Sequence, residues 1–92
     1  MLWAPLHSVN HGELPDKWEV VLNAFKYLQK FTIQYQLIME RSMFGGGVEY
    51  RCTLVRWDVE GGHARKRTVL FETTDPKHAE LILTVLISEA KQ

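Results

Sequence analysis

The chain contains a single cysteine, Cys52, among its 92 residues. No internal disulfide can form, although secreted domains of this size are often held together by disulfides. No window approaches the roughly 18 consecutive apolar residues that a membrane span requires. The first residues also lack the basic start and the long apolar run of a signal peptide. These absences predict a cytoplasmic protein with no membrane partner.

The chain also lacks an excess of charge of either sign. Eleven basic residues balance eleven acidic residues, so the formal net charge is zero. Dedicated nucleic-acid binders usually carry a basic excess, because phosphate contacts supply much of their affinity. The balance counts against that class but leaves room for a local basic patch. A hydrophobic content of 46% with 24% charged residues is typical of one globular domain.

Residue sets that would carry chemistry are missing as well. His7 and His11 are four residues apart, but no second cysteine or carboxylate cluster completes a zinc site. Cys52 has no adjacent base, and an inward-facing thiol is inert. The glycines 45–47 join two expected strands, whereas a phosphate-binding loop opens a helix. The sequence therefore predicts a protein that is not an enzyme and that has no catalytic residue, metal or cofactor.

Hydrophobic periodicity divides the chain into an irregular N-terminal arm, residues 1–13, and a single α+β domain, residues 14–92. Steps of three and four predict a helix over residues 16–29, and alternation predicts strands over 31–40, 48–59 and 64–72. Asp75 and Pro76 then open a second helix as its cap and first residue. The predicted fold class is α+β in the order α-β-β-β-α, a three-stranded antiparallel sheet with two helices packed on one face.

The second hairpin predicts which side chains face away from the helices. If Gly61 and Gly62 form a two-residue turn, Glu60 pairs with His63. The helix side then carries Leu54 opposite Val69 and Cys52 opposite Phe71. Toward the turn the same side carries Asp58 opposite Arg65, with Arg56 near Arg67. The opposite face, called the open face below, carries residues 32, 34, 36 and 38 of the first strand. It also carries the pairs Arg51–Glu72, Thr53–Leu70, Val55–Thr68 and Trp57–Lys66.

This open face is more apolar than solvation requires, which favours a binding surface. Trp57 beside Lys66 is its expected aromatic anchor. One alternative is that the N-terminal arm folds across the face through Leu2, Trp3 and Leu6. Another is a one-residue slip, which would exchange the two faces. The basic run 63–67 is either a solvated strand end or a contact for an acidic protein or a nucleic-acid backbone. The predicted partner-binding residues are Ile38, Val55, Trp57, Arg65, Lys66, Arg67 and Leu70.

The element order and two short segments resemble the double-stranded RNA-binding domain. The segments are 35–40, which begins Tyr-Gln-Leu and ends in Glu40, and 50–54, Tyr-Arg-Cys-Thr-Leu. The resemblance covers about residues 16–90. It implies phosphate contacts from Lys17, Lys26, Lys77 and His78. The family's Gly-Pro-x-His loop is replaced here by residues 43–47, and its paired lysines by Lys77 alone.

Two functions follow as hypotheses. The first is a non-catalytic protein-interaction module, a small regulator or inhibitor of the phage or mobile-element accessory type. It would bind another protein, or a second copy of itself as a homodimer, through the open face and the tip of the second hairpin. The alternative is an RNA-binding domain of degenerate double-stranded-RNA-binding type.

Overall fold

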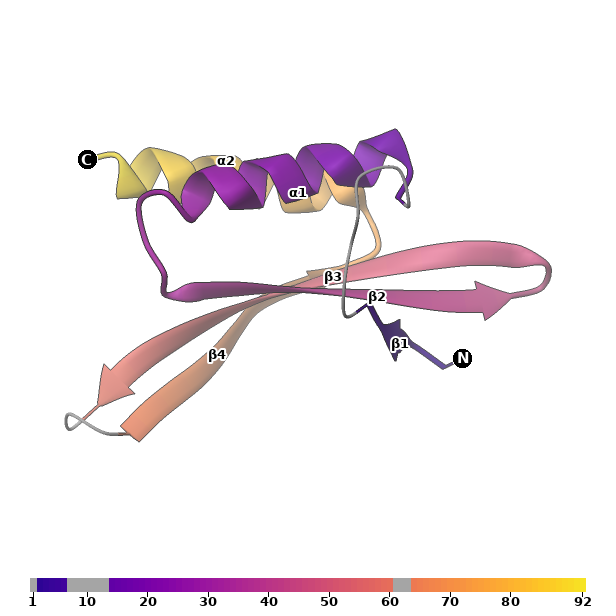
Figure 1. The fold of residues 1–92 in the computed structure, drawn as a ribbon, viewed down its shortest axis with the longest axis horizontal. Helices are drawn as coiled ribbons and strands as arrows, with labels where there is room; N and C mark the ends of the chain where they lie inside the picture. The colour runs from indigo at the N-terminus through magenta and orange to yellow at the C-terminus, as the bar shows by residue number, and fades with distance from the viewer. Residues whose placement is uncertain (1, 7–13, 61–63) are drawn as a thin grey trace.

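The computed structural model describes residues 2–6, 14–60 and 64–92 and confirms the predicted fold class (Figure 1). Two helices lie side by side on one face of an antiparallel sheet. No helix among the described residues is long and apolar enough to cross a bilayer. The elements in chain order are β1 (Ala4–Pro5), α1 (Asp16–Leu28), β2 (Tyr35–Phe44), β3 (Gly47–Glu60), β4 (Ala64–Thr73) and α2 (Pro76–Ala90).

The sheet has four strands rather than the expected three, in the order β1-β2-β3-β4. The additional strand comes from the N-terminal arm, where Ala4 pairs with Arg41 and Pro5 with Glu40. The backbone N–H of Leu6 donates to the carbonyl of Met39 at 2.9 Å and extends this pairing. A proline is tolerated because β1 is an edge strand, where one N–H is not needed for the ladder.

Local signals set the ends of both helices. The Asp75 carboxylate accepts the backbone N–H of Lys77 at 3.0 Å, and Pro76 is the first residue of α2, as predicted. In α1 the carbonyl of Pro15 accepts the N–H groups of Trp18 and Glu19 at 2.9 and 3.2 Å. Turns after Leu28 then delay the start of β2 to Tyr35, so the strand expected from residue 31 begins four residues later.

The helices and the sheet enclose one apolar core. Both helices bury the apolar residues that recur at steps of three and four against β2, β3 and β4. This removes apolar surface from water and supplies most of the driving force for folding. Leu6 of the N-terminal arm packs against the same core. The buried members are Leu14, Trp18, Val21, Phe25, Leu28, Met39, Cys52, Leu54, Phe71, Ala79 and Leu83.

The sheet is longer than the helix layer that covers it. The 14 residues of β3 span about 46 Å, whereas the 13 and 15 residues of the helices span about 20 and 22 Å. The β2–β3 hairpin projects beyond the helices, and the β3–β4 hairpin twists away from them, in a molecule with a long axis of 47 Å (Figure 1). The β2–β3 hairpin turns through Gly45 and Gly46. Their φ values of +58° and +81° fit the two-residue type I′ turn.

The predicted register of the second hairpin is wrong. Glu60 pairs with Ala64 and not with His63, so three residues separate the strands. The expected Gly61–Gly62 turn lies outside the described residues. An irregularity between Leu54 and Val55 then adds one residue to β4, because Leu54 pairs with Phe71 and Val55 with Val69. The observed pairs are shifted by one residue near the tip and by two at the base. The corrected pairs are Arg56–Thr68, Trp57–Arg67, Asp58–Lys66 and Val59–Arg65 near the tip and Thr53–Glu72 at the base.

Candidate functional site

The open face has two halves, and the N-terminal arm contributes to the first. Arg51 lies there between Glu40 and Glu72, with N–O distances of 2.8 and 3.3 Å. The ring of Trp3 packs against the Arg51 guanidinium, whose carbon is 4.5 Å from the ring centroid. The cation is thus held by two carboxylates and an aromatic face, an arrangement that serves packing of β1 onto the sheet. In this half of the open face, Arg51 is therefore already engaged by contacts within the chain.

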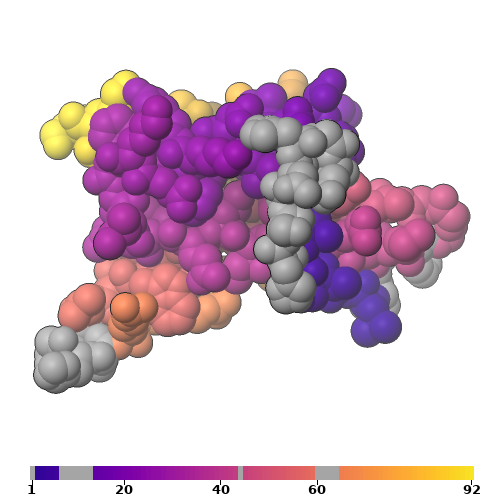
Figure 2. All heavy atoms as spheres, in the orientation of Figure 1, coloured from indigo at the N-terminus to yellow at the C-terminus, as the bar shows by residue number. Residues whose placement is uncertain are grey.

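The second half is the open face of the projecting β3–β4 hairpin. We call residues 57–60 of β3 and 64–67 of β4 the β3–β4 ribbon. Cross-strand partners lie on the same face of a sheet, and alternate residues share a face. Trp57 and Val59 therefore share the open face with Arg67 and Arg65, their partners. In the space-filling view the ribbon extends beyond the helices at one corner of the molecule (Figure 2).

Trp57 has a fixed orientation on this face. Its backbone N–H donates to the carbonyl of Gln34 at 2.8 Å, whereas its indole Nε1 donates to Oε1 of Gln36 at 3.0 Å. Gln36 is the cross-strand partner of Val55, so the indole leans back along β3 toward Val55. This explains why Val55 is fully buried although it lies opposite the helices and outside their core.

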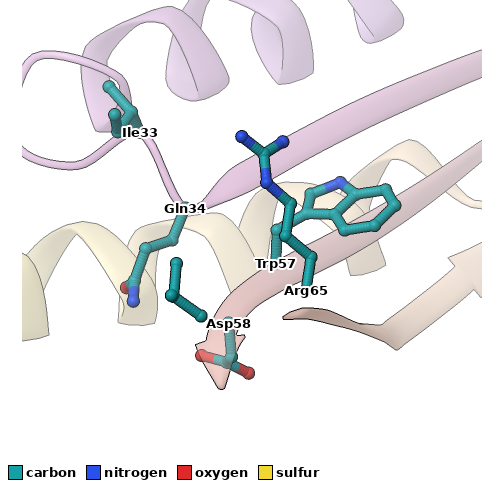
Figure 3. A pocket seen from close by; sticks show the side chains of 6 residues that line it. Ile33, Gln34, Trp57, Asp58 and Arg65 are labelled. Carbon is teal, nitrogen blue, oxygen red and sulfur yellow. The ribbon is translucent and has the colours of Figure 1, made fainter. Parts of the chain in front are cut away.

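A hollow of about 430 Å³ lies beside Trp57 (Figure 3). Ile33 and Val59 contribute apolar side chains that are 94% and 70% exposed. In Figure 3 the Arg65 guanidinium and the Trp57 indole rise from the ribbon on the same side, while the Asp58 carboxylate points the other way. A partner side chain could pack against the apolar wall and meet Arg65 at its rim. Gln34 and Asp58 complete the lining.

Positive charge on the ribbon is only partly neutralised. Arg56 and Asp58 form an ion pair at 3.1 Å, so this acid is already engaged. Arg65, Lys66 and Arg67 are exposed, and no ion pair joins any of them to another described residue. Arg65 and Arg67 therefore present two cations on the open face that have no ion-pair partner among the side chains the structure describes.

The structure brings together five of the seven predicted partner-binding residues. Ile38, Val55, Trp57, Arg65 and Arg67 belong to the open face by register, although Val55 is inaccessible. Arg65 and Arg67 were expected on the helix side of the hairpin tip, and the observed register places them on the opposite face. Lys66 and Leu70 were assigned to that face wrongly. The expected turn is one residue shorter than the observed one, so the prediction exchanged the two faces of β4 between the turn and the irregularity. Lys66 pairs with Asp58 on the helix side of the sheet, so Trp57 is opposite Arg67. Leu70, the extra residue of the irregularity, packs against the helix-covered core.

Sequence reasoning missed three exposed apolar residues of this surface. Val69 was expected under the helices, but it pairs with Val55 on the open face and is 48% exposed. Ile33 was expected inside a strand, yet it lies in the loop before β2. Val59 was expected within its strand but was not assigned to the candidate surface. Its position two residues after Trp57 in the same strand could have placed it on the same face.

The four residues implied by the RNA-binding resemblance do not form one surface. Lys17 and Lys77 line a hollow between the helix N-termini, together with the acids Asp75 and Glu80. Lys26 follows Lys17 by nine residues, which at about 100° per residue places it on the opposite side of α1. The His78 ring lies 6.1 Å from that of Phe71.

The reactive and metal-binding side chains that the structure describes form no assembled site. Cys52 is fully buried, and desolvation raises the pKa of its thiol from 9.0 to about 12. Among residues 2–6, 14–60 and 64–92 no three metal-ligating side chains cluster. The histidine pair at positions 7 and 11 lies outside those ranges.

Comparison of this chain with known protein families, with curated proteins and with solved structures found no match.

Proposed function

We propose that this protein is a non-catalytic protein-interaction module, a small regulator or inhibitor, that binds another protein through the open face of the β3–β4 ribbon. The observation that carries this proposal is the exposed hollow of Trp57, Ile33 and Val59 with Arg65 at its rim. Aromatic residues and arginines are enriched among the residues that dominate binding energies. Exposed apolar side chains flanked by charges are also the usual composition of an interaction site.

The position of the hollow supports the same function. The ribbon diverges from the helix layer, so a partner can approach it without touching the helices (Figure 2). Trp57 is held by the Gln36 hydrogen bond before any partner arrives, which lowers the entropy lost on binding. The exposed arginines would attract an acidic partner and raise the association rate more than the final affinity.

Binding of duplex RNA is the second candidate. One observation favours it, since Lys17 and Lys77 face a common hollow between the helix N-termini. Asp75 and Glu80 share that hollow and would repel phosphate. The balanced net charge of the chain also predicts that any such binding is weak and falls steeply with added salt.

The test is affinity capture with the full tagged chain, with and without nuclease, followed by purification of the captured protein and measurement of its Kd. Trp57→Ala should weaken that Kd by at least about 2 kcal/mol, roughly thirtyfold. Leu81→Ala is the control, because Leu81 is 65% exposed on α2 away from the ribbon. Capture that disappears with nuclease and that Lys17→Glu abolishes would favour RNA instead.

Stability must be measured on the same variants. The Trp57 ring covers Val55, so its removal should cost folding stability, by about 1–2 kcal/mol. Folding should nevertheless remain cooperative, because the helix-covered core does not include this ring. Unfolding of Trp57→Ala would make the residue structural. In that case Arg65→Glu, which removes no buried contact, tests the surface by itself.

A further inference from the structure

The β4 edge presents its backbone hydrogen-bonding groups on the same positions that carry the ribbon's arginines. The N–H of Trp57 donates to Gln34, so the backbone of Trp57 points toward β2 and away from β4. Its partner Arg67 is therefore in a non-hydrogen-bonded pair with β3. The N–H and C=O of Arg67 then point outward from the sheet. The same alternation applies to Arg65 and Val69.

This outward edge has no partner strand among the described residues. β4 ends the strand order, whereas the opposite edge of the sheet is occupied by β1 of the N-terminal arm. The sheet thus already accepts a short extended segment at one edge. The irregularity at Leu70 interrupts the pairing pattern, which limits the free edge to about the five residues 65–69.

Charge decides which segment suits this edge. The side chains of Arg65 and Arg67 lie on the open face, while the backbone N–H and C=O groups of the same two residues point outward from the edge of β4. A second copy is a poor occupant, because antiparallel self-pairing centred at positions 65–67 places arginine opposite arginine. Carboxylates opposite these two residues would instead form favourable cross-strand pairs.

We propose that the partner contributes a short acidic segment, which pairs as an added strand with the outer edge of β4 at residues 65–69. The proposal rests on the protein-interaction function given above and names the partner's chemistry. In an antiparallel addition an apolar side chain lies opposite Val69, and acidic side chains lie opposite Arg67 and Arg65. The partner pattern is therefore apolar, any residue, acidic, any residue, acidic. Main-chain hydrogen bonds supply affinity and the alternate side chains supply specificity.

The probe is the capped peptide Thr-Val-Thr-Glu-Thr-Glu-Thr, titrated into the full ¹⁵N-labelled chain. Binding should perturb the amide signals of Arg65, Arg67 and Val69 and slow their hydrogen exchange, because these amides become hydrogen-bonded. A peptide with lysine in place of both glutamates should bind at least about tenfold more weakly. A peptide N-methylated at its valine and glutamates should bind too weakly to give exchange protection, because it cannot donate to the backbone carbonyls of Arg65, Arg67 and Val69.

Two adjacent charge reversals provide the matched control. Arg67→Glu and Lys66→Glu change the net charge equally, but their side chains lie on opposite faces of β4. With the acidic peptide, Arg67→Glu should weaken binding at least about fivefold more than Lys66→Glu. Equal effects would mean that only the overall charge is felt and would overturn the strand-addition proposal. A second copy as occupant would appear as dimerisation of the free chain.

Failure of this proposal is distinguishable from failure of the proposed function. A captured protein whose binding requires Trp57 but leaves the β4 amides exchanging at the free rate would overturn strand addition and leave the interaction function standing. No binding of the acidic peptide, together with an Arg67→Glu variant that retains the captured protein, would do the same. Capture that is insensitive to every change on the ribbon would overturn both.

Discussion

At the scale of single residues, Cys52 is the clearest case of burial controlling chemistry. The thiol is fully buried, and desolvation raises its pKa to about 12. Alkylation of the folded protein by iodoacetamide at pH 8 should be far slower than that of a free cysteine peptide, because the thiolate is the nucleophile. Denaturant should restore the peptide rate. Rapid modification of the folded chain at neutral pH would contradict the burial and the placement of β3.

The same pKa shift has a consequence for stability. The folded state holds the Cys52 proton more strongly than the unfolded state does, since its pKa lies above the ordinary value of 9.0. Between pH 9 and pH 12 the unfolded chain therefore loses this proton first. The contribution of the neutral thiol to stability is complete below about pH 9 and is lost as the pH rises toward 12.

At the scale of elements, the β2–β3 turn depends on backbone conformation rather than contact. Gly46 has φ +81°, and a Cβ built there meets no atom within 4 Å. Gly46→Ala should lower the unfolding free energy by about 1 kcal/mol. Alanine is penalised in the left-handed conformation that glycine adopts freely, and no steric clash adds to this cost. Urea denaturation measures this. Gly47→Ala is the control and should change stability less, since Gly47 does not have positive φ. Equal losses would contradict the type I′ assignment.

Helices and strand order could be predicted because each element carries its own periodicity. The Asp75–Pro76 start of α2 is a local signal that tertiary structure leaves intact. β1 could not be predicted, because two residues that include Pro5 carry no strand pattern. Its formation depends on the edge of β2 and on contacts such as Trp3 with Arg51.

The residues of the candidate surface could be predicted only within single strands. Trp57 and Val55 were placed correctly because the parity of β3 does not depend on its neighbours. The face assigned to Lys66 required the length of the turn, and that assigned to Leu70 required the irregularity in β4. A turn of three residues instead of two moves every side chain of the following strand to the other face of the sheet, and one added residue further along moves the later side chains back. Neither the turn length nor the irregularity can be recognised from the hydrophobic pattern of the sequence.

At the scale of the whole molecule, the length of the sheet relative to the helix layer separates the buried core from the surface proposed for binding. The middle of β3, around Cys52 and Leu54, lies under both helices and is fully buried. Its two ends project beyond that cover (Figure 1). Local opening of a segment is least costly where few apolar groups are buried. The ribbon therefore belongs to the part of the fold that can open without unfolding the core.

Amide hydrogen exchange of the full chain checks this separation. Among β3 amides that are hydrogen-bonded to neighbouring strands, protection should be greatest near Leu54 and should fall toward both Val48 and Val59. Core amides should exchange only through global unfolding, whereas ribbon amides should exchange through local opening that costs less free energy. Added urea should accelerate the core amides strongly and the ribbon amides weakly, because local opening exposes little surface. The amides of α1 near Phe25 serve as the internal reference for global unfolding. Equal protection along the whole of β3 would show that the ribbon opens only with the core, so that a partner must recognise it as a rigid surface.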